Sequence, residues 1–192
     1  MPRIDSEKFY NNAILKHGLS AKGVNWISKE TQDIRFDTIL KLLPKDIVSL
    51  VDAGCGFGDF YLYLKKRERL PLSYIGIDSL QKMQNIALKQ TNQKILLANI
   101  LKDTIPHANY YICSGAMNIL TRFETHLFIR NCFMACERGF IFNILHGEEK
   151  NSNYNYLNKK EIEDIAKILA VKNLKIITGY MKNDITVGFF KQ

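Results

Sequence analysis

The sequence contains 192 residues, of which 46% are hydrophobic and 24% are charged. This length and composition suit one globular domain with a substantial core, and they exclude a disordered chain. The sequence has no uninterrupted run of the roughly 18 to 20 apolar residues that a membrane-spanning helix needs. Its first residues also lack the apolar centre of a secretory signal, so we expect a cytoplasmic location and no membrane partner.

The formal net charge is +8 at pH 7, and this basic balance keeps an anionic partner such as RNA among the alternatives. The excess is carried by 20 lysines against 7 arginines, although arginine is the usual reader of bases and phosphates. Only residues 65–67 form a tight basic run. We therefore interpret most of the positive charge as a solvated lysine surface.

Two of the four cysteines, Cys132 and Cys136, stand four residues apart in an apolar segment. A zinc site needs further ligands at suitable spacing, and no second Cys/His pair accompanies these two residues. We interpret the cysteines as reduced, buried thiols, and we expect no metal ion.

The first 44 residues have the pattern of two helices. The first occupies residues 5–17, and the second follows a loop and runs from Ser28 to Pro44. An apolar stripe that starts at Ile34 predicts the buried face of the second helix. We expect residues 1–44 to form a helical extension of the domain that follows.

After this extension, short apolar strands alternate with helical segments. In chain order the expected elements are a strand at 47–51, a helix at 57–67, a strand at 73–77, a helix at 80–90, strands at 94–97 and 109–113, a helix at 121–136, a strand at 140–144, a helix that begins after Asn158, and strands at 174–180 and 185–190. This alternation indicates a parallel sheet with helices on both faces. The last two strands are joined by a tight turn, which indicates an antiparallel hairpin. We predict an α/β fold of three layers around a seven-stranded mixed sheet.

The strongest functional signal is the segment VDAGCGFGDF, which joins the first strand of the sheet to a helix. Its glycines, Gly54, Gly56 and Gly58, allow a sharp turn close to a ligand, and the helix start adds free N–H donors. A dinucleotide-binding loop places two residues between its last two glycines, whereas one residue stands between them here. Asp52 precedes the loop and would repel a pyrophosphate, but its carboxylate can help to hold the cationic end of S-adenosylmethionine.

The next two strands end in polar side chains. Asp78 closes the segment YIGIDS and offers a paired acceptor for the two hydroxyls of a ribose. Its alternative role is to cap the following helix, although Ser79 is the cap that we expect there. Asn99 follows the third strand and can bond the edge of an adenine ring on which Ile100 packs; the alternative is an ordinary asparagine in a turn.

The fourth strand ends in the small residues Ser114 and Gly115, which leave room for a methyl-bearing sulfonium against the backbone. Enzymes that methylate an exocyclic nitrogen of a nucleic-acid base commonly carry an Asn/Asp-Pro-Pro-aromatic segment at this place. The sequence has no such segment.

Together these motifs and the closing hairpin resemble the Rossmann-like, class I S-adenosylmethionine-dependent methyltransferases over about residues 50–192. The resemblance implies that Asp52 is the acidic residue at the tip of the first strand, that residues 53–58 form the glycine loop, and that Asp78 binds the ribose. The adenine-binding position, usually Asp in this family, is Asn99 here.

The extension resembles a subgroup of small bacterial methyltransferases in which a helical segment with the pattern WxSxxxQxxRF covers the cofactor. Here the pattern is formed by Trp26, Ser28, Gln32, Arg35 and Phe36. The resemblance implies that residues 1–44 form a lid over a catalytic domain at 45–192 and that Arg35 binds the cofactor carboxylate in a bidentate fork. It also implies that Tyr10, His17 and Trp26 line the substrate pocket. The alternative is a helix with a surface arginine and a core tryptophan.

The cofactor-binding residues expected from the motifs and the resemblance are Arg35, Asp52, Ala53, Gly54, Cys55, Gly56, Gly58, Asp78, Ser79, Asn99, Ile100, Ser114 and Gly115. Methyl transfer is an in-line displacement, so positioning supplies much of the acceleration, and a general base is needed only for an acceptor that stays protonated. His146, just past the fifth strand, is the one candidate base, with simple exposure as its alternative.

We therefore expect an enzyme that transfers a methyl group from S-adenosylmethionine to a small-molecule acceptor. Methylation of RNA or of a protein is the first alternative, motivated by the basic charge. A nicotinamide-dependent oxidoreductase is a second alternative, which the glycine spacing and the hairpin disfavour. A non-catalytic adaptor that has kept the fold is a third.

Overall fold

The computed structural model describes residues 4–147 and 153–192. Its N-terminal part consists of α1 (Ser6–His17), a short 3-10 helix, η1 (Ala21–Val24), and α2 (Lys29–Leu42). The Asp5 carboxylate accepts the Lys8 backbone N–H at 3.0 Å and starts α1, and the Ser28 hydroxyl accepts the Thr31 N–H at 3.2 Å and starts α2. Both predicted helix starts are confirmed, whereas η1 lies in a segment predicted as loop.

The rest of the chain forms a mixed sheet with connecting helices. In chain order its elements are β1 (Ser49–Ala53), α3 (Asp59–Lys66), β2 (Ser73–Asp78), α4 (Gln81–Thr91), β3 (Lys94–Leu97), β4 (Ala108–Ser114), η2 (Ala116–Ile119), α5 (Arg122–Ala135), β5 (Cys136–His146), β6 (Tyr156–Leu157), α6 (Lys159–Ile168), β7 (Asn173–Ile177) and β8 (Asp184–Phe190). The strand order is β3-β2-β1-β4-β5-β8-β7. Strands β1 to β5 are parallel, and β8 is antiparallel to both β5 and β7.

This order confirms the predicted seven-stranded sheet with its terminal hairpin. An eighth strand, the two-residue β6, pairs with β5 beside the main path and lies in a segment predicted as a polar loop. No helix in the described part of the chain is both long and apolar enough to cross a membrane.

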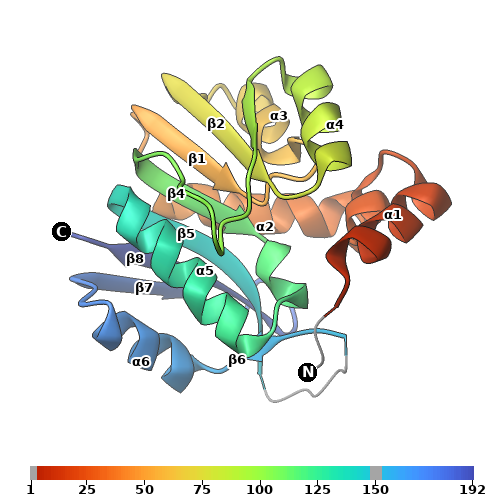
Figure 1. Ribbon diagram of the computed structural model, residues 1–192. Coiled ribbons are helices and arrows are strands. Elements are labelled where there is room, and N and C mark those ends of the chain that lie inside the picture. The colour runs from red at the N-terminus through yellow and green to blue at the C-terminus, as the bar shows by residue number, and fades with distance from the viewer. Residues whose placement is uncertain (1–3, 148–152) are drawn as a thin grey trace.

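The molecule has three layers, as predicted. In Figure 1 α5 and α6 lie on the near face of the sheet and α2 crosses behind it. One core cluster joins α5 and α6 to the sheet through residues such as Ile129 and Ile162. A second cluster on the opposite face joins α2, α3 and α4 through residues such as Ile39, Leu64 and Ala87. Burial of these two apolar layers is the main source of stability.

The predicted stripe of α2 is confirmed at Thr38, Ile39 and Leu43, which are buried, but not in the first half of the helix. Ile34 is 37% exposed, whereas Gln32 and Arg35 are buried. The reason is that α2 packs against β5 and β8, where the sheet presents polar side chains such as Thr186. The period of apolar residues cannot indicate a helix face whose partner surface is polar.

Arg35 forms a buried ion pair with Asp184 at the start of β8, and their side chains are only 7% and 1% exposed. The Tyr180 hydroxyl donates to the second carboxylate oxygen of Asp184 at 2.7 Å. Burial raises the pKa of Asp184, and the Arg35 guanidinium acts against this shift. The carboxylate therefore has a partner for each oxygen, which is the condition under which a buried charge is tolerated.

A chain of hydrogen bonds continues from this pair into the sheet. Thr186 Oγ1 donates to the Tyr180 hydroxyl at 2.8 Å and accepts from Asn143 Nδ2 at 2.6 Å. Ser114 Oγ, at the end of β4, donates to Asn143 Oδ1 at 2.9 Å. Thr38 Oγ1 of α2 lies 2.7 Å from Thr186 Oγ1 and closes the network on the helix side. The network thus connects α2, the hairpin and the end of β4.

The buried pair gives a test of stability. We expect Asp184→Asn, which keeps the side-chain shape but leaves the Arg35 guanidinium without its counter-ion, to lower the free energy of unfolding by about 3 to 5 kcal/mol. The matched control is Asp33→Asn, because Asp33 pairs with Lys29 at 3.0 Å on the surface. This control should cost less than about 1 kcal/mol. Urea unfolding curves measure both values, and equal losses in the two variants would contradict the prediction.

Candidate functional site

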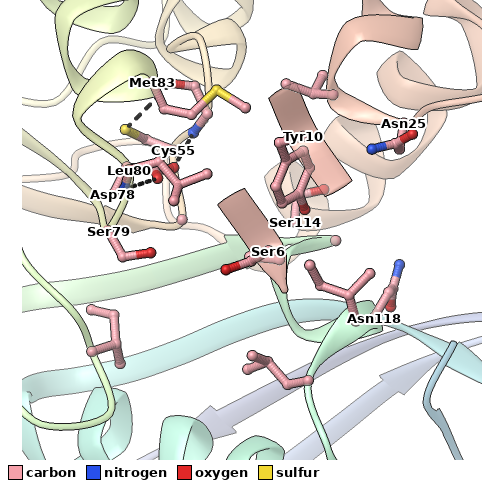
Figure 2. Close-up of a pocket in the computed structure, with 18 of the residues that line it drawn as sticks. Ser6, Tyr10, Asn25, Cys55, Asp78, Ser79, Leu80, Met83, Ser114 and Asn118 are labelled. Carbon is pink, nitrogen blue, oxygen red and sulfur yellow. Dashed lines mark hydrogen bonds between the residues drawn. The ribbon is translucent and has the colours of Figure 1, made fainter. Parts of the chain in front are cut away.

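A cavity lies at the carboxyl ends of the parallel strands. The chain leaves β1 toward β2 and β3 on one side and returns to β4 on the other side, so the connections diverge between β1 and β4. Open α/β sheets bind ligands at such a switch point. The segments that follow β1, β2, β3 and β4 line the cavity, together with α1 and the segment before α2. Figure 2 shows side chains from these segments facing a common space.

Most of the residues predicted for the site lie at this cavity. Those that line it are Tyr10, Trp26, Asp52, Gly54, Cys55, Gly56, Asp78, Ser79, Asn99, Ile100, Ser114 and Gly115. The structure therefore brings together residues from four strand ends and from the N-terminal extension, over much of the length of the chain.

The glycine loop needs its glycines for backbone geometry and for packing. Gly54, Gly56 and Gly58 have φ values of 78°, 55° and 83°, a region that side chains with a Cβ atom rarely adopt. A Cβ atom on Gly58 would lie only 2.5 Å from Thr91 Cγ2 of α4. Gly58 does not line the cavity, and neither does Ala53, which is buried in β1. Gly58 allows α3 to start close to α4.

Asp78 holds the glycine loop against the start of α4. One carboxylate oxygen accepts the Gly56 N–H at 3.0 Å, and the other accepts the Leu80 N–H at 3.0 Å. Burial raises the pKa of Asp78 to about 6, although these backbone hydrogen bonds oppose the shift. The prediction that Ser79 caps α4 is wrong, because α4 begins after Leu80 and the Asp78 carboxylate satisfies the Leu80 N–H. Asp78 thus supports the helix start and also lines the cavity.

Asp52 is a buried carboxyl group at the end of β1, with 3% of its surface exposed. The Tyr74 hydroxyl donates to it at 2.9 Å. Burial, together with the charges of Asp78 and Asp59, raises the pKa of Asp52 to about 7, against the opposing effect of the Tyr74 hydrogen bond. A cationic ligand in the cavity would favour the ionised form of this group.

The cavity is acidic although the chain is basic. Asp52, Asp59, Asp78 and Glu124 line it, and the described lining residues include no lysine, arginine or histidine. Asp59 accepts a hydrogen bond from Gln32 Nε2 at 3.0 Å, which fixes its position near the start of α3. Several carboxylates in one partly enclosed space favour a cationic ligand and disfavour a phosphate group.

Asn99 and Ile100 lie side by side after β3. Asn99 Oδ1 accepts the Leu101 N–H at 2.9 Å, so the side chain forms the turn that was the alternative interpretation of this residue. Its oxygen is engaged, which leaves the amide nitrogen as the group that a ligand can use. Ile100 is buried and offers an apolar surface beside it.

The N-terminal extension closes one side of the cavity. A small apolar cluster joins Ile14 of α1 to Phe57 of the glycine loop and Met83 of α4, with Tyr10 packed against it. Trp26 lies over the Arg35 guanidinium, 4.5 Å from the ring centroid. A Cβ atom on Gly115 would come within 2.6 Å of Trp26 Cη2, so the absence of a side chain there makes room for the indole ring.

Besides Ala53 and Gly58, three more predicted site residues lie outside the cavity. Arg35 points to Asp184 instead, because that carboxylate is its buried counter-ion. His17 is exposed at the end of α1. His146 Nδ1 lies 2.9 Å from the Leu157 carbonyl oxygen, a contact that holds the ring against β6.

Other lining residues were not predicted. They include Asn25, Asn118, Glu124 and Tyr154, and Figure 2 labels the first two of them. Asn118 closes the segment YYICSGAMN, which begins within β4 and ends in η2, so its place just after the fourth strand was the signal that could have identified it. Tyr154 lies in a loop with no recognisable motif, and nothing in the sequence pointed to it.

Comparison with known proteins supports the fold. No protein-family model matches the sequence, and no match was found among curated proteins. A solved structure of magnesium protoporphyrin IX methyltransferase from Synechocystis PCC 6803, with bound S-adenosylhomocysteine, is similar with a TM-score of 0.74 and 12% identity, covering 97% of this chain and 98% of that chain. A possible histamine N-methyltransferase from Thermotoga maritima is similar with a TM-score of 0.69 and 13% identity, covering 96% of this chain and 95% of that chain.

The methyltransferase domain of a bacterial Hen1 protein gives a TM-score of 0.67 and 14% identity, covering 83% of this chain and 98% of that domain. The chain therefore has the Rossmann-like fold of the class I S-adenosylmethionine-dependent methyltransferases.

The raised pKa of Asp52 gives a prediction about pH. The group favours folding when protonated, and this contribution is lost as pH rises from about 4 toward 7. We expect Asp52→Asn, which mimics the protonated form, to gain stability over the wild type between pH 5 and pH 8 by more than about 1 kcal/mol, since one pKa unit corresponds to about 1.4 kcal/mol. Denaturant unfolding without added ligand measures this difference. The control is the exposed Asp46→Asn, and a pH-independent difference for Asp52→Asn would contradict the prediction.

Proposed function

We propose that the protein binds S-adenosylmethionine in this cavity and transfers its methyl group to a small-molecule acceptor, leaving S-adenosylhomocysteine. The observation that carries the proposal is the pair of carboxyl groups, Asp52 and Asp78, at the tips of adjacent strands around the glycine loop. S-Adenosylmethionine carries a sulfonium and an ammonium group, which suit an acidic cavity, whereas the pyrophosphate of a dinucleotide does not. The similar magnesium protoporphyrin IX methyltransferase holds S-adenosylhomocysteine.

In this proposal each strand end binds a different part of the cofactor. Asp78 and Ser79 accept hydrogen bonds from the ribose hydroxyls, and the amide nitrogen of Asn99 donates to the adenine ring, which packs on Ile100. The aminoacyl end lies against the glycine loop at 54–56, near Asp52. The small residues at 114–115 leave space for the sulfonium at the end of β4.

Residues 1–44 act as a lid over the domain at 45–192 in this proposal. Tyr10 of α1 and Trp26 line the cavity, and the cluster of Ile14, Phe57 and Met83 fastens α1 to the glycine loop and α4. A lid of this kind excludes water from the reacting atoms and orients the acceptor.

The chemistry requires binding and orientation more than acid–base catalysis. S-Adenosylmethionine, when bound, supplies an electrophilic methyl group on sulfur. The residues of the chain hold the acceptor in line with that group and keep water out, which supplies most of the acceleration in such a displacement. His146 lies outside the cavity, so the proposal assigns it no proton transfer.

A small-molecule acceptor suits the site better than RNA. The acidic lining would repel the phosphates of a nucleic acid, and α1 covers one side of the cavity. The proposal also includes a cytoplasmic location, with which the four free, buried cysteines are compatible.

Calorimetric titration of the purified protein with S-adenosylmethionine, S-adenosylhomocysteine and NAD tests the cofactor. We expect saturable binding of the two sulfur compounds and none of NAD. Asp78→Ala should weaken that binding at least about tenfold, which is about 1.4 kcal/mol, because the ribose loses its acceptor and the glycine loop loses its hydrogen bond to Asp78. The exposed Asp46→Ala is the control. Binding of NAD alone, or of none of the three compounds, would overturn the proposal.

A second titration tests the alternative acceptor. We expect mixed RNA to show no saturable binding to the complex with S-adenosylhomocysteine at about 0.15 M salt, because phosphates meet carboxylates at the cavity. Binding whose affinity falls steeply with salt and that involves the cavity would favour RNA as the acceptor. The variant Glu124→Gln, which removes one carboxylate from the lining, serves as a probe of that contact.

A further inference from the structure

We propose that the space between Tyr10, Trp26 and Asn118 is the acceptor subsite and that it takes a small, planar molecule that carries no negative charge and has a hydrogen-bond-accepting atom. This inference rests on the function proposed above and specifies its substrate class. The three residues come from α1, from the segment before α2 and from η2, and all of them line the cavity.

Trp26 forms one wall of the subsite, and its position is fixed without a bound ligand. Its ring lies over the guanidinium of Arg35, whose charge is held by the buried carboxylate of Asp184. The other constraint is Gly115 at the end of β4, where a Cβ atom would collide with the indole. A tryptophan fixed on two sides presents a rigid flat surface with little entropy to lose on binding.

Asn118 is a hydrogen-bond donor whose orientation is fixed. Its Oδ1 accepts the Leu145 N–H at 3.2 Å, and its own carbonyl oxygen accepts the Asn155 N–H at 2.7 Å. The first contact assigns the oxygen side of the amide to β5, which leaves Nδ2 as the group that faces the cavity. No described residue accepts a hydrogen bond from Nδ2. Figure 2 shows the amide nitrogen on the side of Asn118 that faces Tyr10 and Asn25.

Tyr10 enters the same space from α1, opposite Asn118 (Figure 2). Burial raises the pKa of its hydroxyl, with Asp78 as the second cause, so the phenol stays protonated and cannot act as a base at neutral pH. An aromatic ring on this side and the indole of Trp26 favour a planar molecule between them.

The chemistry of the lining then limits the charge of the acceptor. The described lining residues offer no cationic side chain to a carboxylate or phosphate, and an unpaired anion in a partly buried site is costly. The Asn118 N–H groups instead match a ring nitrogen or carbonyl oxygen. In the reaction a second atom of the acceptor forms the bond to the methyl carbon with its lone pair. The electrons of the carbon–sulfur bond pass to sulfur, and any proton on the attacking atom is lost to bulk water when the product leaves the cavity.

The test compares two rings of the same shape. Quinoline has a ring nitrogen that accepts a hydrogen bond, and naphthalene has none. In calorimetric titrations of the protein saturated with S-adenosylhomocysteine, we expect quinoline to bind at least about tenfold more tightly than naphthalene, the value of one good hydrogen bond in a dry site. Equal affinities, or no binding of either ring, would overturn the subsite.

Asn118→Asp isolates the donor, because it keeps the oxygen that accepts the Leu145 N–H but replaces the amide nitrogen by a second oxygen. We expect it to abolish the preference for quinoline while the affinity for S-adenosylhomocysteine changes less than about threefold. Asn92→Asp, an exposed asparagine after α4, is the matched control and should keep the preference. An unchanged preference in Asn118→Asp would refute the role of Asn118. Failure of S-adenosylhomocysteine to bind the wild type would instead overturn the proposed function and this inference with it.

Discussion

The buried ion pair between Arg35 and Asp184 is the interaction on which the arrangement of the site depends. Two charges removed from water are costly unless their remaining hydrogen-bonding capacity is satisfied, and here Tyr180 satisfies the second oxygen of Asp184. This requirement explains why the face of α2 toward the sheet is polar at this point. It also explains why Trp26, which lies on the guanidinium, has one defined position at the cavity.

The sequence was sufficient to predict the features that depend on local patterns. The period of apolar residues predicted the parallel strands and the terminal hairpin, and the motif around Gly54–Gly58 predicted where the cavity would form. The partner of Arg35 could not be predicted, because Asp184 is brought near only by the completed sheet. Local spacing likewise placed His146 at the right end of β5 but could not show that its ring turns to Leu157.

The negative charges at the cavity are separated from the positive charges that dominate the rest of the protein. The chain as a whole carries +8, yet four carboxyl groups and no basic side chain lie among the described residues around the cavity. Lysines on the surface are solvated and screened, so they add little at the site itself. Inside, burial raises the pKa of Asp52 and of Asp78, which makes the charge of the cavity responsive to what it contains. The net charge alone would have suggested an anionic ligand.

The position of β8 has a consequence for the order in which the molecule assembles. β8 lies between β5 and β7 although it follows both in the sequence. The last strand to be synthesised therefore occupies an interior position in the sheet. During synthesis Arg35 emerges long before Asp184, and the guanidinium stays hydrated until the hairpin docks. The glycine loop and its strands can therefore form first, while the wall at Trp26 is set only when the hairpin arrives. In nascent chains arrested before residue 184, Trp26 should accordingly have no fixed position, and the cavity should be open to chaperones and proteases.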